Sequence, residues 1–139
     1  MGDKKKIVQE LNQALEREMS NVVTYLHHSF VVRGVNRGPL VDFFRGQAQE
    51  SFGHATKLGE KIVALGGQPS VQVAAIREVK HRSPEQMLRE ELKREKEEVQ
   101  EYIALLKLVD DNITLRLMLE AIVVEEQEGI EELEKRVSM

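Results

Sequence analysis

The sequence contains no cysteine. Disulfides, thiolate zinc sites and cysteine nucleophiles are therefore excluded. Any metal site must use glutamate, aspartate, histidine or backbone oxygen, and such ligands suit iron, manganese or zinc. No hydrophobic run is long enough to span a bilayer, and the first residues are polar without an apolar core behind them. We therefore expect no membrane partner and a cytoplasmic protein.

The chain also lacks an excess of positive charge. Its net charge is −4 over 139 residues, and the basic cluster at residues 4–6 is interpreted as a solvated terminus. This balance argues against nucleic acid as a partner, because nucleic-acid binding calls for a basic face. The length allows one domain with a sizeable core and is short for two. We therefore expect a single domain over residues 1–139.

Helical periodicity dominates the sequence, and no sustained alternation typical of strands accompanies it. The apolar residues predict four helices, at about residues 7–32, 40–65, 84–109 and 113–137. The first and third connections are short, whereas residues 66–82 form a long one. Two tight hairpins joined in this way predict an all-α antiparallel four-helix bundle with one long crossover between helices 2 and 3.

Three segments carry specific signals for helix ends. Ser83-Pro84-Glu85-Gln86 can form a capping box with proline at the first helical position. The Gly-Gly-Gln-Pro run at residues 66–69 predicts the end of the second helix. Residues 110–112, Asp-Asp-Asn, break the third helix and offer caps for the fourth.

Three glutamates interrupt apolar stripes on three different helices. Glu18, Glu95 and Glu126 each lie three residues after one apolar stripe residue and four before the next. A buried carboxylate is costly unless it takes up a proton or a cation, so the joint pattern indicates a cation site. The alternative is that they belong to a solvated face, since 32% of the residues are charged.

The second helix offers the histidine that such a site needs. Di-iron four-helix bundles use one glutamate from each of two helices and Glu-x-x-His from each of the other two. Here the two motifs are incomplete: Ser51 stands three residues before His54, and Gly129 stands three residues after Glu126. Glu50 lies one turn before His54 and is able to swing in as a replacement. A hydrogen-bonded core histidine is the alternative interpretation of His54.

Three further residues are candidates for supporting roles. Tyr25 is expected to donate a hydrogen bond to a carboxylate, unless it is an ordinary core aromatic. His27 and His28 are adjacent, so at most one of them points inward, and His28 is the candidate. Gln47 lies two turns before His54 on the inner stripe and could serve as a weak oxygen ligand.

The order and spacing of these motifs resemble the ferritin-like superfamily, nearest to bacterioferritins and related small prokaryotic ferritin-like proteins. The resemblance covers nearly the whole chain. It rests on residues 15–18 (LERE), 25–28 (YLHH), 49–55 (QESFGHA), 62–69 (IVALGGQP), 87–89 (MLR) with Glu95, and 125–133 (EEQEGIEEL).

The resemblance implies a di-iron site that oxidises Fe(II) with oxygen or peroxide for iron storage. Glu18 and Glu95 would be terminal carboxylates, Glu126 a bridging carboxylate and His54 a terminal ligand. The second bridge and second histidine fall on Ser51 and Gly129, and these departures weaken the expected ferroxidase.

The same resemblance implies iron, as one or two ions, and a homo-oligomer of at least two subunits. Bacterioferritins bind haem through a methionine that falls here at Phe52, so no haem is expected. The leading hypothesis is an iron-binding protein of the storage or oxidation type. Alternatives are a non-catalytic structural subunit, whose buried carboxylates are protonated or bonded to Tyr25 and His28, and a mini-ferritin or rubrerythrin-like protein that protects against peroxide.

Overall fold

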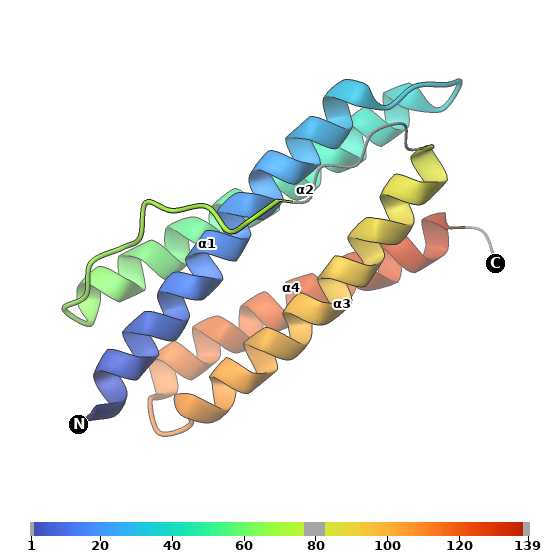
Figure 1. Ribbon diagram of the computed structural model, residues 1–139. Helices are drawn as coiled ribbons and strands as arrows, with labels where there is room; N and C mark the ends of the chain where they lie inside the picture. The colour runs from blue at the N-terminus through green and yellow to red at the C-terminus, as the bar shows by residue number, and fades with distance from the viewer. Residues whose placement is uncertain (1, 77–82, 138–139) are drawn as a thin grey trace. The chain divides into compact units, whose positions relative to one another are not determined.

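The structure is a computed structural model, and it describes residues 2–76 and 83–137. The chain divides into two compact units, Met1–His81 and Arg82–Met139. The described residues form α1 (Gly2–Val31), α2 (Arg37–Ala64), α3 (Pro84–Leu108) and α4 (Ile113–Arg136), and they contain no strand. Each unit is a helical hairpin, α1 packed on α2 and α3 packed on α4, as the connection lengths predict (Figure 1).

Both helices of the first hairpin begin earlier than the apolar pattern indicates. Helix α1 starts at Gly2 rather than near Ile7, because lysines 4–6 are good helix formers and Asp3 favours the first turn. Helix α2 starts at Arg37 rather than near Leu40. Pro39 falls in its first turn, where a backbone N–H would have no partner within the helix. The missing N–H of proline therefore costs no helical hydrogen bond there.

The end of α2 is fixed by two glycines. Gly66 has φ +85°, and its N–H donates to the Val63 carbonyl at 2.9 Å. The Gly67 N–H donates to the Ile62 carbonyl at 2.9 Å, which completes a Schellman motif. A Cβ on Gly67 would lie 2.6 Å from Cγ1 of Val8, so glycine also permits the close approach of this turn to α1.

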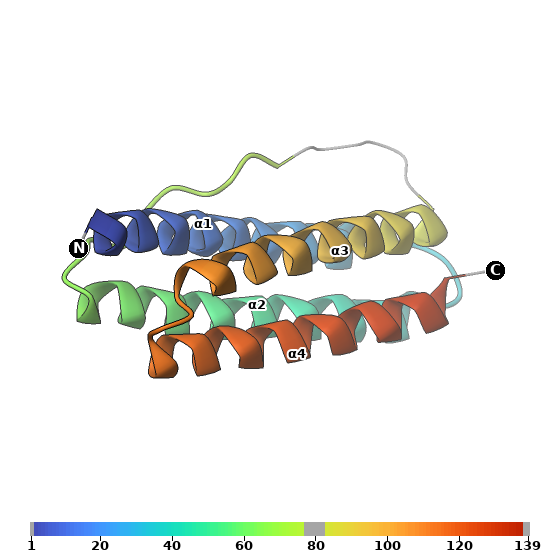
Figure 2. The ribbon, with the colours of Figure 1, turned by 90° about the horizontal axis from the view of Figure 1, so that it is seen from below.

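The segment after this turn runs back along α1 without regular secondary structure (Figure 2). The Asn12 side chain donates to the Gln68 carbonyl at 3.0 Å and accepts from the Ser70 N–H at 2.7 Å. The Ser70 hydroxyl donates to the Glu16 carboxylate at 2.7 Å, and the Ala74 N–H donates to the Glu16 carbonyl at 3.1 Å. These bonds fasten the first part of the predicted long connection to α1; its remainder, residues 77–82, lies outside the described residues.

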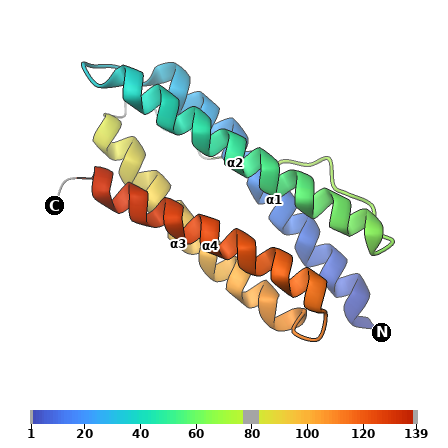
Figure 3. The same ribbon diagram turned by 180° about the vertical axis from the view of Figure 1, so that it is seen from behind.

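Helices α3 and α4 form the second hairpin (Figure 3), and both begin with the predicted caps. The Ser83 hydroxyl accepts from the Gln86 N–H at 3.2 Å, and the Ser83 N–H donates to the Gln86 side chain at 2.8 Å. Pro84 occupies the first helical position. The Asn112 side chain caps α4 by accepting from the Leu115 N–H at 3.1 Å.

Apolar side chains fill the inner face of each hairpin. In the first unit the largest buried ones are Leu11, Tyr25, Phe44, Leu58 and Ile62, and in the second they are Tyr102, Leu115, Leu119, Ile122 and Leu133. Within the described part of the chain, no helix has the length and apolar composition that crossing a bilayer requires. Buried polar residues interrupt these apolar faces, and the candidate site is among them.

Candidate metal centre

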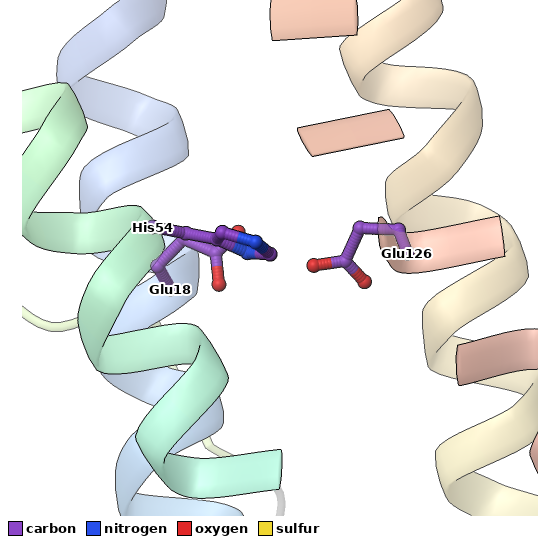
Figure 4. A group of neighbouring side chains, drawn as sticks. All are labelled: Glu18, His54 and Glu126. Carbon is purple, nitrogen blue, oxygen red and sulfur yellow. The ribbon is translucent and has the colours of Figure 1, made fainter. Parts of the chain in front are cut away.

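Glu18 and His54 form the centre of the first hairpin. Glu18 is 1% exposed and His54 is 2% exposed, although both side chains are polar. The Glu18 Oε2 atom lies 3.4 Å from the His54 Nδ1 atom, and Figure 4 shows the two side chains next to each other on α1 and α2. Figure 4 also draws Glu126 of α4, which belongs to the second unit.

This distance suits two ligands of one ion. Nitrogen and oxygen ligands lie about 2.1 Å from a divalent metal such as zinc, so two ligands at a tetrahedral angle are about 3.4 Å apart. The same distance also suits a long contact between a carboxylate and an imidazolium. Geometry therefore allows Glu18 and His54 to share a cation, and the chemistry of the donors suits iron, manganese or zinc.

The other candidates on α2 differ in burial. Ser51 is 5% exposed, so the position that lacks the expected carboxylate does face inward. Glu50 and Gln47 are only partly buried, at the edge of this inner face. Phe52, which stands where the haem methionine was expected, is 57% exposed. The ligand roles of Glu50 and Gln47 stay predictions.

Tyr25 and His28 line the same hairpin beyond Glu18. Both are buried, and His27 is exposed, so His28 is the one of the pair that points inward. The ring of Phe44 packs against both, with centroids 6.3 Å from Tyr25 and 5.5 Å from His28. These residues shape the inner wall of the hairpin; the hydrogen bond expected from Tyr25 to a carboxylate stays a prediction.

Helix α3 buries three glutamates rather than one. Glu95 is buried as its spacing predicts, and Glu91 and Glu98 are buried one turn before it and one turn after it. Arg94 lies between the last two: its guanidinium contacts the Glu91 carboxylate, and its Nε is 3.7 Å from Glu98 Oε2. Sequence reasoning missed Glu91 and Glu98, although Glu91 lies three residues after Leu88, on the stripe that holds Glu95.

Helix α4 buries Glu126 and, one turn later, Gly129. The neighbouring Glu125 is partly buried. Glutamates 120, 128, 131 and 134 are exposed, as expected of the solvated face of this helix. Its burial therefore distinguishes Glu126 from most of the other acidic residues of α4.

Asn21 is an inner polar residue of the first hairpin that sequence reasoning missed. It is 1% exposed, and it lies three residues after Glu18, one turn along α1. Val22, the apolar stripe residue four positions after Glu18, is only partly buried. The spacing from Glu18 to Asn21 to Tyr25 carried the signal, because these residues share one face of the helix.

The chain belongs to the Ferritin family (ferritin-like domain), whose pattern it matches over residues 8–138. Ferritin-like diiron-carboxylate proteins from Bacillus anthracis str. Ames are similar to it in structure, with 27% identity, 99% of each chain covered and a TM-score of 0.93. The bacterioferritin of Desulfovibrio desulfuricans shares 23% identity over 96% of this chain and 79% of its own, with a TM-score of 0.89.

A Dps protein from Bacillus brevis shares 22% identity, 97% coverage of both chains and a TM-score of 0.91. No curated protein gave a significant match. The family match and the four helices of the described residues confirm the predicted ferritin-like superfamily and the all-α four-helix-bundle fold class.

Proposed function

We propose that the chain is a single ferritin-like domain that binds iron with Glu18, His54, Glu95 and Glu126 as ligands. The buried pair of Glu18 and His54 carries this proposal, because the two atoms are spaced for one shared ion. Membership of the ferritin-like family supports it. The Bacillus anthracis relative is described as a diiron-carboxylate protein, and it covers the full length of this chain.

In this proposal Glu126, which is buried in its own hairpin, is the third donor beside Glu18 and His54. Glu95 supplies a carboxylate from α3, and Glu50, which is partly buried on α2, is available as a further donor. Burying carboxylates without compensation costs several kcal/mol each, at about the scale seen for buried ions in proteins. A divalent cation offsets that cost, and hard oxygen donors with one imidazole suit Fe(II).

We propose iron storage or iron oxidation as the role of this binding. Each bound Fe(II) gives up one electron, which oxygen or peroxide takes up. The chain's own part is to hold Fe(II) away from bulk water among buried carboxylates that also stabilise the more highly charged Fe(III). Because Ser51 and Gly129 replace a carboxylate and an imidazole, we expect oxidation to be slower than at a complete di-iron site.

A second candidate is a non-catalytic structural subunit, and the Arg94 cluster favours it. Arg94 places an internal cation beside the buried carboxylates of Glu91 and Glu98, so the side chains of α3 themselves offset this buried negative charge. A mini-ferritin or rubrerythrin-like role in peroxide protection is a further alternative within the same family. The Bacillus brevis Dps protein shares the fold at an identity that supports the fold alone.

We also propose that the protein is a homo-oligomer. Val23, Phe30 and Phe52 are large apolar side chains of the first hairpin, and each is about half exposed or more. Exposed apolar surface of this kind is typical of interfaces between subunits. Light scattering coupled to gel filtration tests this: a mass of at least two chains supports it, and a monomer at micromolar concentration contradicts it.

Anaerobic titration with Fe(II), followed by addition of oxygen or peroxide, tests the binding and the oxidation in turn. The wild type should bind iron stoichiometrically, and Glu126→Gln should lower the affinity at least tenfold. Glu128→Gln is the matched control, because Glu128 is exposed on the same helix. Equal weak binding by all three proteins would support the structural alternative. Rapid oxidation by peroxide but not by oxygen would favour peroxide protection.

A further inference from the structure

The register of the first hairpin follows from two contacts between α1 and α2. Glu18 lies 3.4 Å from His54, and the ring of His28 packs on the ring of Phe44 with centroids 5.5 Å apart. Glu18 and His28 are as far apart along α1 as Phe44 and His54 are along α2. The two helices are antiparallel, so the same pairing of facing residues holds between these two contacts.

Asn21 and Ser51 therefore occupy facing positions in this hairpin. Asn21 comes three residues after Glu18, and Ser51 comes three residues before His54, so each lies one turn from the Glu18–His54 pair in the same direction. Both are almost fully buried, at 1% and 5% exposure. The hairpin thus holds two successive polar layers: one of Glu18 and His54, and one of Asn21 and Ser51.

The second layer is neutral. An amide and a hydroxyl both offer oxygen atoms and hydrogen-bond donors, but neither brings negative charge. Two metal ions in one site lie about 3.5–4 Å apart and repel each other strongly, so such sites depend on anionic ligands shared between the ions. A carboxylate at either position of this layer would supply such a ligand, and the chain has none there.

From this geometry we infer that Asn21 and Ser51 form a neutral layer that restricts the proposed site to a single metal ion. The inference rests on the proposed metal binding and adds its stoichiometry. The Asn21 side chain is longer than that of Ser51 and comes from the facing position on the opposite helix. Both groups lie one turn from the Glu18–His54 pair, so they restrict a second ion without removing the ligands of the first.

The test counts metal ions per chain by anaerobic titration with Fe(II), with Zn(II) as a redox-inert second probe. The wild type should bind one ion per chain. Ser51→Glu and, separately, the nearly isosteric Asn21→Asp should each raise the count to two, because each adds a carboxylate to the neutral layer. Circular dichroism confirms that each variant is folded, and Asn21→Asp keeps the test decisive if Ser51→Glu does not fold.

Two controls separate charge from other causes. Ser51→Ala removes the hydroxyl without adding charge and should leave one ion per chain. Gly129→His adds an imidazole on α4 without adding negative charge, and it should also leave one ion.

Two bound ions per chain in the wild type would overturn the inference while leaving metal binding intact. The same holds if Gly129→His alone binds two ions, or if both acidic variants are folded and bind only one. No ion in the wild type would instead remove the proposed function itself.

Discussion

The carboxylate of Glu18 and the imidazole of His54 lie 3.4 Å apart, on different helices, with almost no access to solvent. Both residues interrupt apolar faces, so packing alone does not account for them. Apolar side chains of similar volume at these positions would be at least as favourable for folding. The pair therefore sacrifices some stability of the metal-free protein, and metal binding gives a reason for it.

Replacing Glu18 and His54 together by leucine should stabilise the metal-free protein. Buried ion pairs exchanged for apolar side chains of similar size change stability by about 1–4 kcal/mol, often in the favourable direction. We expect the double variant Glu18→Leu/His54→Leu to gain about 1 kcal/mol in urea unfolding measured with a chelator present, and to lose iron binding. A loss of more than about 2 kcal/mol without metal would show that the pair stabilises the fold directly.

Arg94 should be far more important for stability than an exposed arginine on the same helix. Arg94→Ala leaves the buried carboxylates of Glu91 and Glu98 without the guanidinium between them. Breaking a buried ion pair in this way costs about 3–5 kcal/mol, and because Arg94 is partly exposed we expect about 2–3 kcal/mol. Arg89→Ala is the control, since the Arg89–Glu85 pair is largely exposed and such pairs contribute about 0–1 kcal/mol. Equal losses in urea unfolding would contradict this account.

Gly67 should tolerate no side chain. Its added Cβ would lie 2.6 Å from Cγ1 of Val8, and overpacking of this kind costs about 1–3 kcal/mol. Gly59→Ala is the matched control, because nothing lies within 4 Å of a Cβ there and Gly59 is inside α2. Alanine at that helical position should stabilise by up to about 1 kcal/mol. Thermal unfolding of the two variants should therefore shift in opposite directions.

Acid should abolish the stabilisation that metal provides. Carboxylate and imidazole ligands bind metal in their deprotonated forms, so protons compete with the ion. At about 100 times the dissociation constant, a bound ion adds about 2.7 kcal/mol to the free energy of unfolding. The increase in melting temperature on adding Zn(II) should be large near neutral pH and should shrink as the pH falls. An increase that is independent of pH would point to binding elsewhere.

Much of the fold follows from the sequence, because its signals are local. The Ser83–Gln86 capping box, the Asn112 cap and the two glycines after α2 each act within a few residues, and each forms as predicted. The starts of α1 and α2 differ from prediction because apolar periodicity does not report a first turn built from lysines, or one that contains Pro39.

The polar interior is harder to predict. Glu18, His54, Glu95 and Glu126 stand on inner stripes and are all buried. Asn21 was missed because the apolar pattern places the stripe position after Glu18 at Val22, the next residue along the chain. The burial of Glu91 and Glu98 is accompanied by contacts of both with Arg94. These contacts depend on the side-chain conformation of Arg94, which the spacing of residues in the sequence does not reveal.

The most direct test of the proposed iron site is a crystal structure of protein loaded anaerobically with Fe(II), with anomalous data collected at the iron edge. The account predicts one anomalous peak per chain, about 2.0–2.2 Å from an oxygen of Glu18 and a nitrogen of His54, with Glu126 among its other ligands. A centre without any anomalous peak, in crystals that hold iron elsewhere on the protein, would contradict it.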